Sequence, residues 1–185
     1  MENKLLHNYT GTLPRCYFRY VDDIFCLFEN ESQVAPFLNA LNVLHKNLKF
    51  TFEMGKGSLP FLNTLIQIDS RNFRTSVFRK KTHTNVMLNF TAVAPSKWKV
   101  GLISCMLSIA KTVCSDENTF LSEVANLRTI FRKNNYPTEF FENVFKRFKE
   151  KQVMPLVRDA ERDFSGITFK VPNFYLLAIK NLHVL

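Results

Sequence analysis

The chain has 185 residues, and 46% of them are hydrophobic, which is enough apolar content for one large core or two smaller ones. This composition excludes a disordered protein, and the low glycine count argues against a fold built on glycine-rich phosphate loops. The formal charge of +9 favours a polyanionic partner, with an anionic membrane surface as the second possibility. No stretch has a signal peptide's pattern or the roughly 20 apolar residues of a spanning helix, so we expect an intracellular protein without a membrane partner.

The first elements predicted are two strands joined by a pair of acids. Residues 1–14 show no clear period and are interpreted as a lead-in to something upstream. Residues 16–21 and 24–28 are rich in aromatic and β-branched side chains and flank Asp22 and Asp23. This pattern predicts a β-hairpin with two carboxylates at its tip.

One helix and three strands should follow the hairpin. Apolar residues recur at helical spacing from Val34 to Leu48, with Pro36 in the first turn, where it is tolerated. Residues 48–53 alternate as a half-buried strand, and residues 55–58 are interpreted as a turn. Residues 59–68 and 73–78 are predicted as two more strands.

From Ser96 the apolar period becomes helical and predicts three amphipathic helices. The first starts at Ser96 as its N-cap, the second spans residues 116–133, and the third follows Thr138. The side chains expected to face the core are Trp98, Leu102, Cys105, Met106, Ile109 and Val113 in the first helix, Phe120, Leu121, Val124, Leu127 and Phe131 in the second, and Phe140, Phe141, Val144, Phe145 and Phe148 in the third. The third carries Lys146, Arg147, Lys149 and Lys151 on its outer side. Residues 152–185 are unassigned, apart from a possible strand at 167–171.

The positive charge is concentrated in one stretch. Between Ser70 and Ser115 there is no acidic residue, but there are eight cations: Arg71, Arg74, Arg79, Lys80, Lys81, Lys97, Lys99 and Lys111. This pattern favours a strip that faces a polyphosphate, and the alternative is a solvated basic face. The four cysteines, Cys16, Cys26, Cys105 and Cys114, lack metal-ligand spacing and are interpreted as small core residues.

Adjacent carboxylates at a hairpin tip repel each other by roughly 2–4 kcal/mol at an effective dielectric constant near 20. Solvent offsets this repulsion in an ordinary turn, because Asp is a common turn residue. A divalent cation such as Mg²⁺, which takes oxygen ligands and supports two-metal catalysis, is the functional alternative for Asp22 and Asp23.

Four ordered blocks decide between these interpretations. They are Phe18-Arg19-Tyr20-Val21-Asp22-Asp23-Ile24-Phe25, Leu48-Lys49-Phe50-Thr51-Phe52-Glu53, Leu59-Pro60-Phe61-Leu62-Asn63, and Ser76-Val77-Phe78-Arg79-Lys80-Lys81-Thr82-His83-Thr84. Over residues 15–150 the chain resembles reverse transcriptases, more narrowly those of Penelope-like retroelements. The resemblance implies an α+β fold, with a partial polymerase palm of antiparallel strands and one helix (15–95), a three-helix thumb (96–151) and a tail (152–185).

The resemblance also implies roles for individual residues. Asp22 and Asp23 would be catalytic ligands of Mg²⁺, Tyr20 would lie near the primer terminus, and Lys49 would protonate pyrophosphate unless it is a solvated strand residue. The residues that would contact the backbone of an RNA template and DNA primer duplex are Arg79, Lys80, Lys81, Thr82, His83, Thr84, Lys97, Lys99 and Lys111. By itself, His83 would be a surface histidine. A nuclear location follows from the resemblance alone.

Several features depart from the family. Positions 63, 78, 81, 85 and 94 carry Asn63, Phe78, Lys81, Asn85 and Ala94, where the family has Asp, Tyr, Pro, Asp and His. No aspartate precedes Asp22, although a two-metal site needs one from another palm strand. We therefore expect the chain to be inactive alone, with a separate amino-terminal polymerase half as a possible partner.

Two alternatives remain open. The helices at 96–114 and 116–133 could form a helix-turn-helix-like module that binds nucleic acid without catalysis. Its phosphate contacts would be Lys97, Lys99, Lys111, Arg128, Arg132 and Lys133. The chain could also be a non-functional remnant of a retroelement. In either binding interpretation we expect contact with the backbone without sequence choice.

Overall fold

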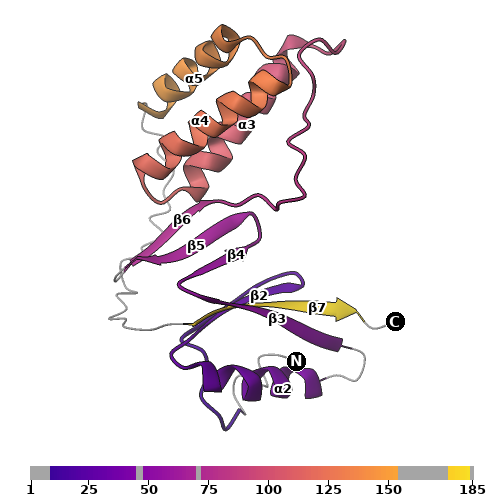
Figure 1. Cartoon of the computed structure of the whole chain (residues 1–185), viewed down its shortest axis with the longest axis vertical. Coiled ribbons are helices and arrows are strands. Elements are labelled where there is room, and N and C mark those ends of the chain that lie inside the picture. The colour runs from indigo at the N-terminus through magenta and orange to yellow at the C-terminus, as the bar shows by residue number, and fades with distance from the viewer. Residues whose placement is uncertain (1–8, 45–47, 70–71, 154–174, 184–185) are drawn as a thin grey trace. The chain divides into compact units, whose positions relative to one another are not determined.

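The fold is α+β, with antiparallel sheets and four α-helices in the part of the chain that the structure describes. This computed structural model describes residues 9–44, 48–69, 72–153 and 175–183 (Figure 1). It divides into two compact units, one formed by residues 1–74 with 169–185 and the other by residues 75–168. The first is called unit 1 and the second unit 2.

The predicted hairpin is confirmed in unit 1. β1 (Cys16–Tyr20) pairs with β2 (Asp23–Phe28) in antiparallel register, with Tyr20 opposite Asp23. Val21 and Asp22 form the two-residue connection, and Val21 has a φ of 52°. A β-branched residue in the left-handed region is strained, so the tip depends on the pairing of the two strands that flank it.

The predicted helix is also confirmed, as α2 (Val34–Val43), which lies along one face of the sheet (Figure 1). Its buried side chains Val34, Phe37 and Leu41 pack in one core cluster with residues of β2 and with Phe50. The side chain of Asn42 accepts from the backbone N–H of Phe50 at 2.6 Å and donates to its carbonyl at 3.3 Å. These two bonds join α2 to the next strand of unit 1.

The sheet contains a central strand that the sequence did not predict. β3 (Leu48–Lys56) and β7 (Tyr175–His183) complete a four-stranded sheet in the order β1-β2-β7-β3. β7 pairs antiparallel with both neighbours, with Ile24 opposite Ile179 on one side and Phe52 opposite Ile179 on the other. The strand expected at 167–171 lies outside the described residues.

Two strand boundaries differ from the predictions. Residues 59–68 are not one strand, because β4 (Ser58–Phe61) and β5 (Thr64–Asp69) form a hairpin around Leu62, whose φ is 51°. The turn expected at 55–58 is shorter, since β3 continues to Lys56 and only Gly57, with a φ of 88°, separates it from β4. β6 (Asn72–Val77) confirms the next predicted strand and completes a sheet of order β4-β5-β6.

Unit 2 contains the three predicted helices, α3 (Ser96–Val113), α4 (Glu117–Lys133) and α5 (Thr138–Val153). Their shared core includes buried residues from all three: Ile103, Leu107, Ala110, Phe120, Val124, Leu127, Phe131, Phe141, Val144 and Phe145. The predicted inward faces of α4 and α5 are largely confirmed. Leu121 is the exception, because it is 42% exposed.

The predicted inward face of α3 is confirmed for Leu102 and Met106, which pack against the core, and is wrong for three other residues. Trp98, Cys105 and Ile109 are exposed, while Ile103, Leu107 and Ala110 are buried. The error arises because apolar residues occupy two adjacent stripes of this helix, so spacing alone fits both. Ser96 is also not the N-cap, since Pro95 takes that position and makes no side-chain cap bond.

We predict that replacing Ile179 with alanine lowers the free energy of unfolding of unit 1 by about 2–5 kcal/mol, because this fully buried side chain fills the core beneath α2. Urea unfolding followed by circular dichroism measures the change. Val43→Ala is the control, since Val43 is 85% exposed and its truncation should cost little. Equal effects of the two variants would contradict the placement of β7 in the sheet.

Candidate nucleic-acid interface

An ion pair with little exposure to solvent holds Arg79, one of the predicted basic residues, against α4. The guanidinium of Arg79 forms a two-point contact with the carboxylate of Glu123 on α4, with Nη1 3.0 Å from Oε2. Their side chains are only 20% and 10% exposed. Asn126 also donates to Glu123 Oε2, at 3.3 Å. Arg79 is therefore neutralised within unit 2 and has no free charge to offer a phosphate.

The sequence analysis missed this pair, although a signal was present. Glu123 lies on the apolar face of the helix, between Phe120 and Leu127. A carboxylate in an apolar stripe needs a cation, because an unpaired buried charge is very costly. Arg79 supplies the cation that Glu123 needs.

Asn134 attaches the following loop to the end of α4. Its buried side chain donates to the carbonyl of Asn85 and accepts from the backbone N–H of Met87, both at 2.9 Å. Its own carbonyl accepts from the N–H of Phe90 at 3.0 Å. Asn85 has a φ of 57°, a conformation that asparagine tolerates better than most residues. The side chain and the backbone carbonyl of Asn134 thus attach the segment from 85 to 90 at three points.

Between these two anchors the predicted contact residues are exposed: Lys80, Lys81, Thr82, His83 and Thr84. The N–H of His83 donates to the carbonyl of Lys80 at 2.9 Å, and Nδ1 of His83 accepts from the N–H of Asn85 at 3.1 Å. Both bonds shape the loop without using the ammonium groups of Lys80 and Lys81. Those two cations form no hydrogen bond or ion pair with any residue that the structure describes.

The predicted lysines of α3 differ in how far they are engaged. Lys99 donates to the carbonyl of Phe90 at 2.6 Å and lies 4.9 Å from the centre of its ring. Lys111 pairs with Glu117 at 3.1 Å and lies over the ring of Phe120. Lys97 is exposed and makes no such contact among the described residues. Of the three, Lys97 alone keeps its full charge available.

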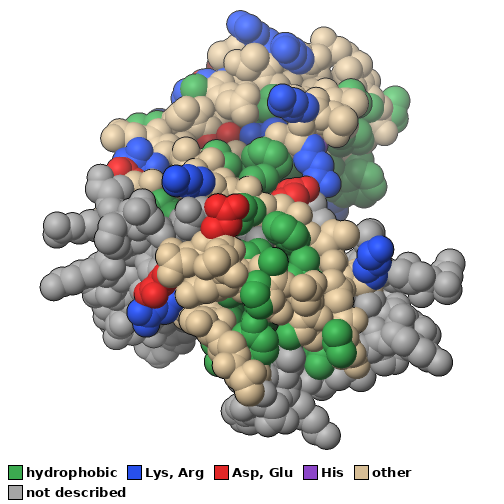
Figure 2. All heavy atoms as spheres, turned by 60° about the horizontal axis from the view of Figure 1, so that its bottom comes forward, with side chains coloured by type: hydrophobic (Ala, Val, Ile, Leu, Met, Phe, Trp, Pro, Cys, Tyr) green, Lys and Arg blue, Asp and Glu red, His purple; other side chains and the backbone are tan. Residues whose placement is uncertain are grey.

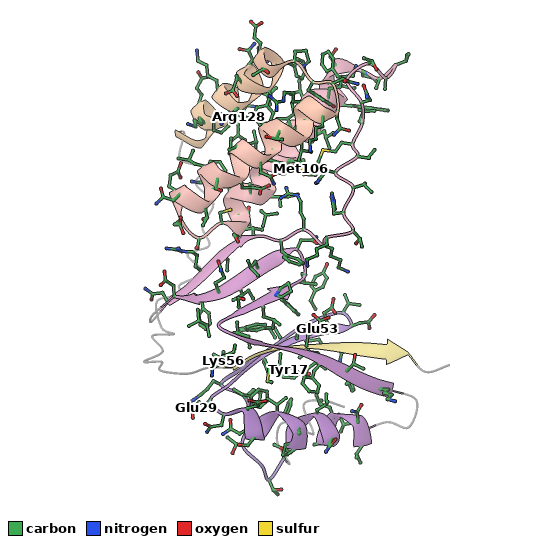
Figure 3. All side chains as sticks on the ribbon, in the orientation of Figure 1. Tyr17, Glu29, Glu53, Lys56, Met106 and Arg128 are labelled. Carbon is green, nitrogen blue, oxygen red and sulfur yellow. The ribbon has the colours of Figure 1, made fainter. Side chains whose placement is uncertain are left out.

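The same distinction applies to α4 and α5. Arg128 donates to both oxygens of Glu142, at 2.6 and 3.2 Å, and lies between the two helices (Figure 3). Exposed cations without a hydrogen bond, ion pair or ring contact in the described part of unit 2 are Lys80, Lys81, Lys97, Arg132, Lys133, Lys146, Arg147 and Lys151. On the face shown in Figure 2, blue side chains of the helical unit are separated by other residues.

In unit 1, the structure places the predicted acidic residues at the tip of the hairpin. Tyr20 is 62% exposed, Asp22 is exposed in the turn, and Asp23 is partly buried at the start of β2. The register sets Tyr20, Asp23, Lys180 and Thr51 in one row across the sheet. Lys49 is exposed on the same face as Thr51, but β7 separates its strand from that of Asp23.

The hairpin does not by itself fit the predicted Mg²⁺ site. Within the described ranges, no group of three or more His, Cys, Asp or Glu side chains is close enough to hold a metal ion. The strand that pairs with Asp23 contributes Lys180 at that row, not a further carboxylate. Two adjacent carboxylates cannot bridge two cations, so the hairpin pair alone does not complete a two-metal site.

The cysteines follow the core prediction except for Cys105, which is exposed. Cys26 is buried, and burial raises the pKa of the Cys16 thiol to about 11. Burial also raises the pKa of Cys114. Cys16 and Cys114 are consequently protonated thiols at neutral pH and poor nucleophiles.

Part of unit 2 is similar to a known protein family. Residues 86–146 are similar to the family model of the animal helix-turn-helix domain, which covers α3, α4 and the start of α5. Neither the curated proteins nor the solved structures that were searched contain a match. The match supports the helix-turn-helix-like alternative.

Among the helices that the structure describes, none combines the length and the apolar character of a membrane-spanning segment.

We predict that Arg79→Ala lowers the free energy of unfolding of unit 2 by about 3–5 kcal/mol, because it leaves the carboxylate of Glu123 buried without a cation. Thermal and urea unfolding measure this change. Arg15→Ala removes an ion pair with Glu29 whose side chains are 59% and 44% exposed, and should cost less than about 1 kcal/mol. Similar losses in both variants would contradict a buried structural role for Arg79.

Proposed function

We propose that unit 2 is a nucleic-acid-binding module that contacts the phosphate backbone without choosing a sequence. The observation that carries this proposal is the set of eight exposed, unpaired cations in the described part of unit 2, a unit similar to a helix-turn-helix family. Unpaired cations release counterions from nucleic acid when they meet phosphate, which gives affinity independent of sequence. Paired cations such as Arg79 contribute much less.

The connections between the helices also support this proposal. Residues 114–116 join α3 to α4, and residues 134–137 join α4 to α5. Helix-turn-helix units use connections of about this length, and they place one helix in a groove while neighbouring groups contact the backbone. In the second connection Asn135 takes a left-handed conformation, with a φ of 64°.

We predict that replacing Lys80 and Lys81 together with glutamine weakens binding of a DNA duplex and lowers the slope of log affinity against log salt by about 2. Fluorescence anisotropy at several salt concentrations measures both. The control is the double variant Arg15→Gln and Lys56→Gln, which removes the same charge from exposed positions of unit 1 outside the predicted site. A salt-independent affinity of the unmodified chain would refute the proposed function.

A second proposal concerns unit 1, which we infer is related to the palm of reverse transcriptases, with the template-primer duplex as the partner of the chain. The observation in its favour is the strained two-residue tip that carries Asp22 between Tyr20 and Asp23. Strained backbone of this kind is concentrated at functional sites. The relationship does not require this chain to catalyse.

We predict that the chain extends no primer in the presence of Mg²⁺, because among the described residues no third carboxylate joins the hairpin pair, and a two-metal site needs one. A primer-extension assay with the unmodified chain and with Asp22→Asn measures this. Nucleotide incorporation by the unmodified chain, lost in the Asp22→Asn variant, would contradict this prediction and establish a polymerase.

A further inference from the structure

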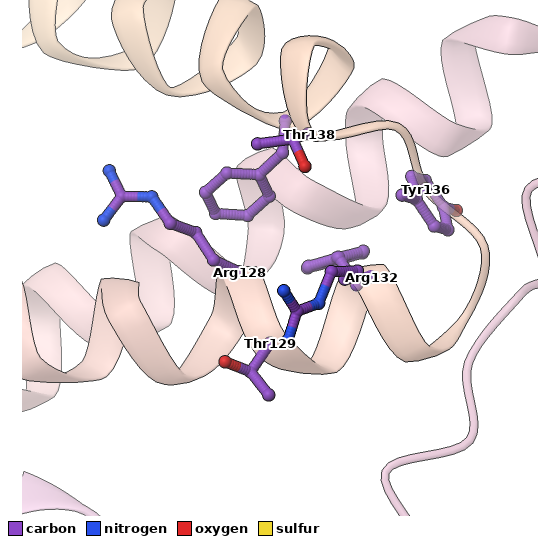
Figure 4. A pocket seen from close by; sticks show the side chains of 7 residues that line it. Arg128, Thr129, Arg132, Tyr136 and Thr138 are labelled. Atoms are coloured by element: carbon purple, nitrogen blue, oxygen red, sulfur yellow. The ribbon is translucent and has the colours of Figure 1, made fainter.

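A small pocket lies between α4 and α5, at the connection that joins them (Figure 4). Its volume is about 150 Å³. Phe131, Tyr136 and Phe141 line its apolar part, and Arg128, Arg132 and Thr138 line its polar part. Sites for whole small molecules measure roughly 300–1,000 Å³, so this pocket suits one group of a larger molecule.

The charge of the pocket is positive. Two of its lining residues are arginines and none is acidic. Glu142 already neutralises Arg128, which also lies 5.4 Å from the ring of Phe145. The side chain of Arg132, one helical turn further along α4, is exposed and makes no hydrogen bond, ion pair or ring contact among the described residues. Arg132 therefore gives the pocket its uncompensated charge.

The start of α5 adds donors at the same place. Thr138 is its first residue, and the bond from the N–H of Phe141 to the carbonyl of Pro137 belongs to the first turn. The N–H groups before Phe141 have no acceptor within the helix, and the helix dipole makes this end positive. Glu139 lies in the same turn and opposes an anion there. Arg132 and the helix end together outweigh that single carboxylate.

We propose that this pocket binds one phosphate of a nucleic-acid backbone, with Arg132 as the principal contact. The planar guanidinium donates two parallel hydrogen bonds to phosphate, which an ammonium group cannot reproduce. The proposal rests on the nucleic-acid-binding function of unit 2. It adds that one arginine acts at a defined site, whereas its neighbours act only through their charge.

Lys133 provides a matched control, because it follows Arg132 directly, is equally unpaired and exposed, and does not line the pocket. We expect Arg132→Gln to weaken binding of a DNA duplex about tenfold or more, and Lys133→Gln to weaken it about twofold, in anisotropy at fixed salt. Arg132→Lys should recover only part of the loss. Glu139→Gln should strengthen binding, because it removes the opposing carboxylate.

Amide chemical shifts give a second readout that charge alone would not produce. Titration with a dinucleotide should shift the N–H signals of Thr138, Glu139 and Phe140 in the unmodified chain, and the shifts should disappear in Arg132→Gln. Equal losses in Arg132→Gln and Lys133→Gln, with these amides unaffected, would overturn the pocket and leave the proposed function intact. Failure of the unmodified chain to bind any nucleic acid would instead refute the proposed function.

Discussion

The arrangement of unit 2 depends on the need to pair one buried carboxylate. Glu123 lies in the apolar face of α4, where an uncompensated charge would oppose folding. The guanidinium of Arg79 neutralises this carboxylate. The contact holds Arg79 against α4, and the exposed segment begins at the next residue, Lys80. Asn134 then holds the chain again at Asn85 and Met87. The exposed loop between Arg79 and Asn85 is consequently short and held at both ends, so its two lysines are confined to one region of the surface of unit 2.

The local elements were predictable because each depends on neighbours in the sequence. The hairpin, α2 and the second and third helices follow from apolar periods that the structure confirms. The face of α3 was not predictable, because Trp98, Cys105 and Ile109 form an apolar stripe beside the truly buried one. The cation strip between Ser70 and Ser115 was found from the sequence. Its division into engaged and free residues depends on Glu117, Glu123 and the carbonyl of Phe90, which only the fold brings near.

β7 escaped prediction for a different reason. Its partners are residues 23–28 and 48–56, more than a hundred residues earlier in the chain, so no local pattern identifies its place. Yet this strand lies between β2 and β3 and contributes Leu176, Ala178 and Ile179 to the two cores on either face of the sheet. Its pairing also sets the backbone of Lys180 in register with Asp23. A strand from the far end of the sequence thus completes the sheet beside the hairpin.

The proposed binding surface is defined by the partners of the cations more than by their number. A phosphate that displaces Glu123 from Arg79 or Glu142 from Arg128 must first break an existing pair, and its gain is reduced by that loss. A phosphate that meets Lys80, Lys97 or Arg132 displaces only solvent and mobile counterions, and their release favours binding. The net charge of +9 therefore does not show where a phosphate would be attracted, because it counts paired and unpaired cations alike. Arg132 differs from the other free cations because it has a pocket beside it, and a rigid, planar group next to a shaped surface favours one geometry of phosphate over the rest.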